Sequence, residues 1–124
     1  MTTIESYRDL RVWQGAMDLC VAVYKASASF PSSEIYGLTS QMRRAAVSIP
    51  SNIAEGHRRS RADYARFVSI ARGSAAEIDI QLELAHRIGY LPEEDYRALN
   101  ESLAAVGRQL TSLHNKLKQT GTKA

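Results

Sequence analysis

Arginine is the residue type whose number and spacing in this sequence most favour a specific chemistry. The second third of the chain carries Arg43, Arg44, Arg58, Arg59, Arg61 and Arg66. A planar guanidinium group binds a phosphate group through two parallel hydrogen bonds, so clustered arginines favour the backbone of RNA or DNA as a ligand. We expect these six residues to gather around a turn between two helices, where the N-terminus of the second helix adds unpaired N–H groups. No exposed aromatic residue is expected among them, which predicts contacts with the backbone rather than recognition of bases.

The charged residues of the chain form blocks of opposite sign. The net charge is +3 overall, but residues 43–72 hold seven arginines against two acids, a net charge of +5. Residues 73–101 hold two arginines against seven acids, a net charge of −5. Such blocks fit complementary contacts between helices or subunits, or a basic surface for an anionic partner. Solvated faces without a partner are the alternative.

No other set of residues has the spacing that catalysis or metal binding requires. The histidines at positions 57, 86 and 114 are too far apart in sequence to form a ligand cluster, and a zinc site needs converging ligands. Glu83 and His86 have the Glu-x-x-His spacing of di-iron bundles, but this spacing occurs once, and we expect a surface pair. Cys20 has no charged neighbour that would make it a reactive thiolate, so we expect a small apolar residue. The sequence therefore predicts no enzyme, no metal site and no cofactor.

The apolar residues recur at helical spacing throughout the chain. This pattern predicts an all-α protein that folds as one domain, residues 1–124, into an antiparallel up-down-up-down four-helix bundle. The helices are expected at about residues 9–29, 37–55, 60–88 and 92–118, with a short disordered tail after about residue 119. No apolar run approaches the roughly 20 residues that span a bilayer. A single cysteine fits a reducing compartment, and we expect a cytoplasmic protein without membrane contact.

The second helix contains a proline within its apolar pattern. Pro50 lacks a backbone N–H and crowds the preceding turn, at a cost of about 3 kcal/mol inside a helix. We expect a kink rather than a break, because the apolar pattern continues beyond it and Ser48, Ser51 and Asn52 can bond the freed backbone groups. Two glycines are expected to close helices in the left-handed conformation. They are Gly56 for the second helix and Gly89 for the third.

The first and third helices carry more apolar residues than one face of a bundle needs. In the first helix, the main stripe is expected to be Leu10, Trp13, Met17, Val21, Tyr24 and Ala28, with a second row of Val12, Ala16, Leu19 and Val23. In the third helix, a second row contains Ile70, Gly73, Ile80 and Leu84. We expect Gly73 to permit close approach of another helix. An exposed apolar surface of this size is unusual in a monomer, so these four residues are predicted to form an oligomer interface.

One stretch of the second helix also resembles a known family motif. The segment Ser48-Ile49-Pro50-Ser51-Asn52-Ile53-Ala54-Glu55-Gly56 resembles the signature of a bacterial four-helix-bundle family, whose members are encoded by intervening sequences inside 23S ribosomal RNA genes and elsewhere. The resemblance covers nearly the whole chain. It includes Asp9–Gln14, Phe30-Pro31, Glu34, Gly37-Leu38, Gln41, Ile70–Ser74, Glu77 and Gly89–Leu91.

This family is similar to the accessory proteins of diversity-generating retroelements. That similarity implies a ring-shaped homopentamer that binds nucleic acid and a reverse transcriptase. From the residues and the resemblance together, we expect a non-enzymatic homo-oligomer that binds RNA or DNA. The alternative is a structural or adaptor oligomer that binds a protein partner.

Overall fold

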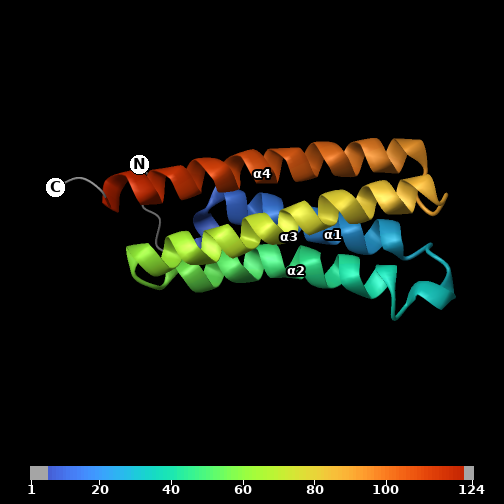
Figure 1. The fold of residues 1–124 in the computed structure, drawn as a ribbon, viewed down its shortest axis with the longest axis horizontal. Coiled ribbons are helices and arrows are strands. Elements are labelled where there is room, and N and C mark those ends of the chain that lie inside the picture. Colours follow the sequence, from blue (N-terminus) through green and yellow to red (C-terminus); the bar gives the residue numbers. More distant parts are fainter. Residues whose placement is uncertain (1–5, 122–124) are drawn as a thin grey trace.

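The computed structural model of the chain describes residues 6–121, and within this range it consists of helices and turns (Figure 1). The four long helices are α1 (Arg11–Ser27), α2 (Leu38–His57), α3 (Arg61–Arg87) and α4 (Glu93–Gly121). Two short 3-10 helices precede α1 and α2, namely η1 (Tyr7–Asp9) and η2 (Ser32–Glu34). No strand occurs among the described residues, and the prediction of an all-α chain with four helices is confirmed.

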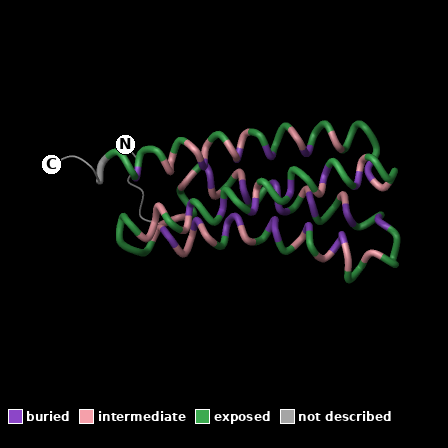
Figure 2. Tube along the Cα trace, in the orientation of Figure 1, coloured by how far each residue is buried: buried purple, intermediate pink, exposed green. Residues whose placement is uncertain are grey.

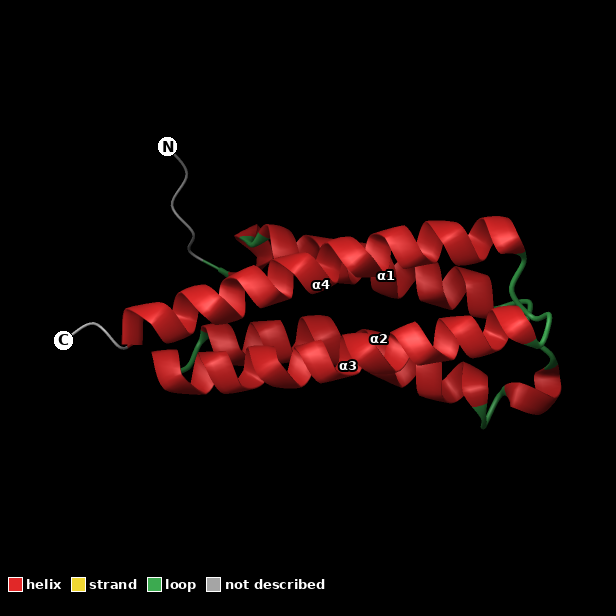
Figure 3. Ribbon diagram, turned by 45° about the horizontal axis from the view of Figure 1, so that its top comes forward, coloured by secondary structure: helices red, strands yellow, loops and turns green. Residues whose placement is uncertain are grey.

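The four helices lie side by side along the long axis of the molecule (Figures 1 and 3). Each helix contacts two others, because α1 and α3 both pack against α2 and α4. The α1–α2 and α3–α4 connections lie at one end, and the α2–α3 turn lies at the other, beside the C-terminal end of α4 (Figure 1). Residues that are distant in sequence are thereby brought to a common end of the bundle.

A single hydrophobic core runs between the helices, and the exposed positions face outward (Figure 2). The apolar stripe of α4 is buried at Leu99, Leu103, Val106, Leu110 and Leu117, as its regular spacing predicts. Burying a large aliphatic side chain stabilises the fold by about 1.5–3 kcal/mol. This stripe therefore fixes which side of α4 faces the bundle, and its charged residues face solvent.

In α1, the buried row is the one that was expected to be secondary. The residues that pack inward are Val12, Ala16, Leu19, Cys20 and Val23, whereas Met17, Val21 and Tyr24 of the expected main stripe are exposed. Small residues let α4 come close to α1, because a Cβ at Gly15 would lie 3.4 Å from Gln109 of α4. The bulkier row instead borders an open groove of about 520 Å³ beside α2.

α2 continues through Pro50, which is buried. The side-chain amide of Asn52 donates to the backbone oxygen of Ser48 at 2.7 Å and to its hydroxyl at 3.0 Å, one of the backbone contacts expected near the proline. Gly56 does not close the helix, contrary to prediction, because α2 extends to His57. Gly89 has φ +87° at the end of α3, as predicted.

Gly56 marks the close approach of α2 and α3. A Cβ at this position would lie 2.8 Å from Cβ of Phe67 and 2.9 Å from Cδ1 of Tyr64, and both residues belong to α3. Gly73 was expected to have this role, but a Cβ there would meet no described atom within 4 Å. No helix of the described chain therefore packs over Gly73.

The C-terminal helix is longer than its apolar pattern predicts. α4 ends at Gly121, beyond the expected end at residue 118, and the rest of the expected disordered tail lies outside the described residues. None of the helices in the described range has an apolar stretch long enough to cross a membrane.

Candidate nucleic-acid interface

The structure separates the six arginines into two groups. Arg43 and Arg44 lie in the first third of α2, and Arg58 follows the last residue of that helix. Positions 43 and 58 are fifteen residues apart, which is about 22 Å at 1.5 Å per residue. The expectation of one cluster is therefore corrected for Arg43 and Arg44, because α2 continues as one helix between them and the turn.

Arg43 has a structural role between α1 and α2. Its Nε donates to the hydroxyl of Ser27 at 2.9 Å, and its Nη2 donates to the backbone oxygen of Tyr24 at 3.1 Å. The guanidinium group also lies 4.6 Å from the centre of the Tyr24 ring. A cation near the C-terminal carbonyl groups of a helix is favourable. Arg43 thus stabilises the end of α1 and is occupied by these contacts.

The remaining four arginines lie at one end of the bundle, here called the basic end. It comprises the residues of the α2–α3 turn and the neighbouring turns of α3 and α4 that carry charge: Glu55, Arg58, Arg59, Arg61, Asp63, Arg66, Arg72, Lys116 and Lys118. Seven cations against two acids give this end a net charge of +5. Nε of Arg61 donates to the backbone oxygen of Leu117 at 3.3 Å, which joins α3 to the last turns of α4.

Local capping explains where α3 begins at this end. The hydroxyl of Ser60 accepts a hydrogen bond from the backbone N–H of Asp63 at 3.3 Å, as the Ser-x-x-Asp spacing predicts. The other N–H groups of the first turn of a helix have no partner within the helix and carry partial positive charge. The positive end of α3 therefore adds to the charge of the arginines.

The ion pairs of the basic end are exposed and share few acids. Arg59 donates through Nε to Glu55 at 2.8 Å, and Arg58 reaches the same carboxylate at 4.0 Å with 75% of its side chain exposed. Arg66 lies 3.8 Å from Asp63. The hydrogen bond from Arg59 lowers the pKa of Glu55, and the charges of both arginines add to this effect. Exposed pairs of this kind contribute about 0–1 kcal/mol, so a phosphate group can replace the carboxylate at little cost.

A half-buried aromatic ring lies among these arginines. The guanidinium group of Arg66 lies 4.6 Å from the centre of the Phe67 ring, and that of Arg59 lies 5.3 Å from it. Phe67 is half-buried, against Gly56 of α2. The sequence indicates Arg66 beside Phe67, but Arg59 reaches the ring because of the turn. Arginine planes beside an aromatic ring are surfaces on which bases stack.

Both burial and nearby positive charge act on His114, which lies on α4 beside Arg72. Burial is the main cause that lowers the pKa of His114, and the positive charges of Arg72 and Lys118 lower it further. Nη1 of Arg72 lies 3.3 Å from Nδ1 of His114. Because arginine only donates, Nδ1 accepts in this contact and the ring is neutral. An anion bound nearby would favour the protonated ring.

Five acidic residues lie at the opposite end, here called the acidic end: Glu34, Glu83, Glu93, Glu94 and Asp95. The cations at this end include Lys25, Arg43, Arg87 and Arg97. The expected surface pair of Glu83 and His86 does not form, because Glu83 pairs with Arg87 and His86 pairs with Glu93. Over residues 6–121, no group of three or more His, Cys, Asp or Glu side chains is placed to hold a metal ion.

The residues predicted to form an oligomer interface lie on the outer side of α3. Ile70, Ile80 and Leu84 are exposed, with 68% of Ile80 accessible, and Ile88 extends the same row. Gly73 is exposed within this row. The residues of α3 that face the bundle core form a different row, namely Val68, Ala71, Ser74, Ile78, Leu82 and Ala85.

Comparison with known proteins gives two findings. Residues 8–112 match the family described as 23S rRNA-intervening sequence protein. Among solved structures, the chain is similar to a protein of unknown function from the S23 ribosomal protein family of Bacteroides thetaiotaomicron, with 27% sequence identity and a TM-score of 0.75. The match covers 83% of this chain and 97% of the other. A search of curated proteins found no match.

Proposed function

The chain belongs to the 23S rRNA-intervening sequence protein family, and on this premise we propose that it is a non-enzymatic homo-oligomer that binds the backbone of RNA or DNA. The observation that carries the proposal is the net positive charge of the basic end, where Arg58 is exposed and Arg59 and Arg66 lie over Phe67. Phosphate contacts of this kind release counterions and give affinity with little preference for sequence.

The oligomeric part of the proposal rests on the exposed apolar row of α3. Four large aliphatic side chains along one helix form a surface that monomeric proteins rarely expose. We extend the proposal to a ring of five antiparallel, up-down-up-down bundles, which the sequence resemblance to the accessory proteins of diversity-generating retroelements implies. Head-to-tail contacts that close produce such rings.

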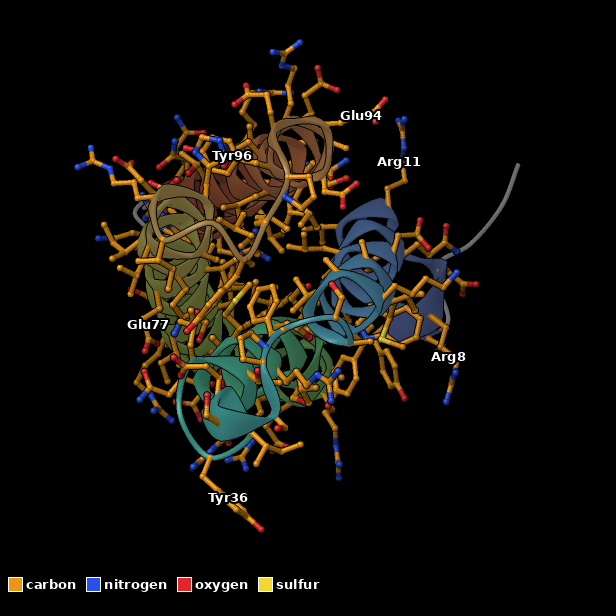
Figure 4. The ribbon with its side chains drawn as sticks, turned by 90° about the vertical axis from the view of Figure 1, so that its right-hand side faces the viewer. Arg8, Arg11, Tyr36, Glu77, Glu94 and Tyr96 are labelled. Carbon is orange, nitrogen blue, oxygen red and sulfur yellow. The ribbon has the colours of Figure 1, made fainter. Side chains whose placement is uncertain are left out.

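A structural or adaptor oligomer with a protein partner is the second candidate. The groove between α1 and α2 favours it, because exposed apolar side chains line the groove on both helices, including Met17, Val21 and Val47. Tyr36 is 95% exposed and points away from the bundle (Figure 4). Apolar and aromatic residues of this kind are typical anchors for protein partners.

The nucleic-acid proposal is tested by fluorescence anisotropy of labelled single-stranded RNA and DNA over a salt series. Replacing Arg58, Arg59 and Arg66 together with alanine should weaken binding and reduce the slope of log affinity against log salt by about 2, or roughly 0.7 per phosphate contact. Arg61 is left intact because it also bonds α4. The matched control is the double variant Arg87→Ala and Arg97→Ala at the acidic end. It should retain most of the slope of log affinity against log salt. If the wild-type protein binds neither RNA nor DNA at low salt, the nucleic-acid proposal is wrong and the adaptor function replaces it.

The oligomeric proposal is tested by light scattering at moderate salt. Ile80→Asp and Leu84→Asp should each reduce the measured mass, because they place a charge in the apolar row. Neither residue belongs to the core of the described bundle, so the monomer should stay folded by circular dichroism. A wild-type mass near 13.7 kDa would contradict the oligomer, and a dimer would contradict the ring alone.

A further inference from the structure

A polar hollow of about 350 Å³ lies between α2 and α3, away from the basic end. Its lining residues are Gln41, Arg44, Ala45 and Ser48 of α2 and Ser74 and Glu77 of α3. Glu77 projects from α3 on the side toward α2 (Figure 4). Pockets for small ligands begin at about 300 Å³, so the hollow has room for one nucleobase.

Helical spacing explains how this hollow arises. Positions 41, 44, 45 and 48 fall on one face of α2, and positions 74 and 77 fall on one face of α3, because residues three and four apart are neighbours on a helix. Ala45 and Ser74 are buried and form the floor. Gln41, Arg44 and Glu77 are exposed and form the rim.

The floor of the hollow keeps one hydrogen-bond donor unused. The hydroxyl groups of Ser74 and Ser48 lie 2.8 Å apart and share one hydrogen bond. The side-chain amide of Asn52 also donates to the Ser48 hydroxyl at 3.0 Å. Two hydroxyl groups have two hydrogens, so one hydrogen has no acceptor among the described residues.

The rim holds a cation and an anion that are not paired. Within residues 6–121, the side chains of Gln41, Arg44 and Glu77 make no hydrogen bond or ion pair. Most of the arginines near the two turns, in contrast, bond a carboxylate or a backbone oxygen of the chain. The hollow thus presents donors on α2 opposite an acceptor on α3, with space between them.

We propose that this hollow binds a guanine base of single-stranded RNA or DNA. Guanine has two acceptors, O6 and N7, that an arginine binds together, and two adjacent N–H donors, on N1 and N2, that a carboxylate accepts together. Arg44 and Glu77 match these two edges. Adenine, cytosine and uracil do not combine two adjacent donors with two adjacent acceptors.

The inference rests on the nucleic-acid part of the proposed function, because the basic end holds the strand whose base enters the hollow. Glu77 lies between Gly73 and Ile80 on α3, so the inference requires a contact between copies that leaves the α2 side of this row open. Ser48 and Arg58 are ten residues apart, or about 15 Å along α2. A strand bound at the basic end therefore reaches the hollow within a few nucleotides. The basic end supplies affinity, and the hollow adds a preference for guanine.

The test uses uridine-rich RNA oligonucleotides that are identical except for one central base. Anisotropy at fixed salt should give the tightest binding for guanine. Glu77→Gln should weaken binding of the guanine oligonucleotide about tenfold and leave the other three unchanged or slightly tighter, since it removes a negative charge. Asp79→Asn is the matched control, because Asp79 is exposed on the same helix outside the hollow and should retain the guanine preference.

Several results would overturn the inference without affecting the proposed function. They are equal wild-type binding of all four oligonucleotides, preference for another base, and equal loss of guanine preference in Asp79→Asn. A change in oligomeric mass of Glu77→Gln by light scattering would assign the hollow to a contact between copies and also overturn it.

A separate titration covers the case in which no oligonucleotide binds and the proposed function fails. Guanosine, which has no phosphate, is then added to the wild-type protein and followed by NMR. Shifts of residues around the hollow that Glu77→Gln abolishes would support a guanine site. The absence of such shifts would overturn it.

Discussion

The two ends of the bundle are built from similar parts, a turn followed by the N-terminus of a helix, but their charges are arranged differently. At the acidic end, Glu93 accepts hydrogen bonds from His86 at 2.8 Å and from Arg97 at 3.1 Å. His86 also stacks on Tyr96, with ring centres 4.2 Å apart. At the basic end, Arg58 and Arg59 share the single carboxylate of Glu55.

This difference separates charges that are matched by nearby opposite charges from an excess of cations that is available to a ligand. The acidic end is also tied across the bundle, because the hydroxyl of Tyr90 donates to Glu34 at 3.0 Å and joins the α3–α4 turn to the α1–α2 connection. At the basic end, the cations outnumber the acids, and a bound anion can balance the excess positive charge. The cations of the basic end are available to a ligand because they lack matching acids, and not only because they are numerous.

The close contact of α2 and α3 beneath the basic end gives the largest expected effect. Gly56→Ala should destabilise the protein by about 1–3 kcal/mol, because the added methyl group overpacks the space beside Phe67 and Tyr64. Gly73→Ala is the matched change on the open side of α3 and should stabilise by roughly 0.5–1 kcal/mol. Urea unfolding at equal protein concentration measures both. Equal effects would contradict the assignment of the close contact to Gly56.

Neutralising one carboxylate at each end should give opposite results. Glu55→Gln releases Arg58 and Arg59, and RNA binding should tighten up to about fivefold at 0.1 M salt, the value of one further phosphate contact. Glu93→Gln removes the acceptor shared by His86 and Arg97, and it should lower the melting temperature with a smaller gain in affinity. Anisotropy and thermal unfolding by circular dichroism test the pair. An equal gain in affinity from both variants would show that net charge, not position, determines binding.

The smallest expected effect is a dependence on pH that differs between the ends. Because the pKa of His114 is lowered from 6.5 in the folded protein, its contribution to stability is present above pH 6.5 and is lost as pH falls through the folded value. The hydrogen bonds from Arg97 and His86 lower the pKa of Glu93 from 4.5, so its contribution is lost only below pH 4.5. Denaturant titrations at several pH values separate the two windows.

The same protonation should favour RNA, because a bound phosphate group stabilises the charged ring of His114. Affinity should rise by less than about fivefold from pH 7.5 to pH 5.5, and His114→Gln should remove most of this rise. His57→Gln is the control, since His57 is the other histidine near the basic end and lies edge-on to Tyr64. A rise that depends on His57 alone would contradict the role of His114.

The helices follow from the sequence because apolar spacing is a local property. The stripe of α4 is unambiguous, and both its helical form and its buried side are correct. In α1, two apolar rows are adjacent, and the choice between them depends on how closely α2 and α4 approach. The same holds for Gly56 and Gly73, since each is a glycine within a helix and only the neighbouring helix distinguishes them.

The candidate site follows from the sequence only in part. Arg58, Arg59, Arg61 and Arg66 are near one another along the chain, so their common location at the turn is predictable. Arg43 is only fifteen positions before Arg58 in the sequence, but it lies about 22 Å from Arg58 along α2. Phe67 beneath two guanidinium groups, and the hollow that joins Arg44 to Glu77, both depend on the pairing of α2 with α3.

Hydrogen–deuterium exchange with and without single-stranded RNA tests the central claim, that the ligand binds at the basic end, most directly. Binding should slow exchange in the α2–α3 turn, around residues 57–66, and in the last described turns of α4. The acidic end, around residues 83–97, should be unchanged. Slower exchange at the acidic end, or bound RNA without any protection of residues 57–66, would contradict the claim.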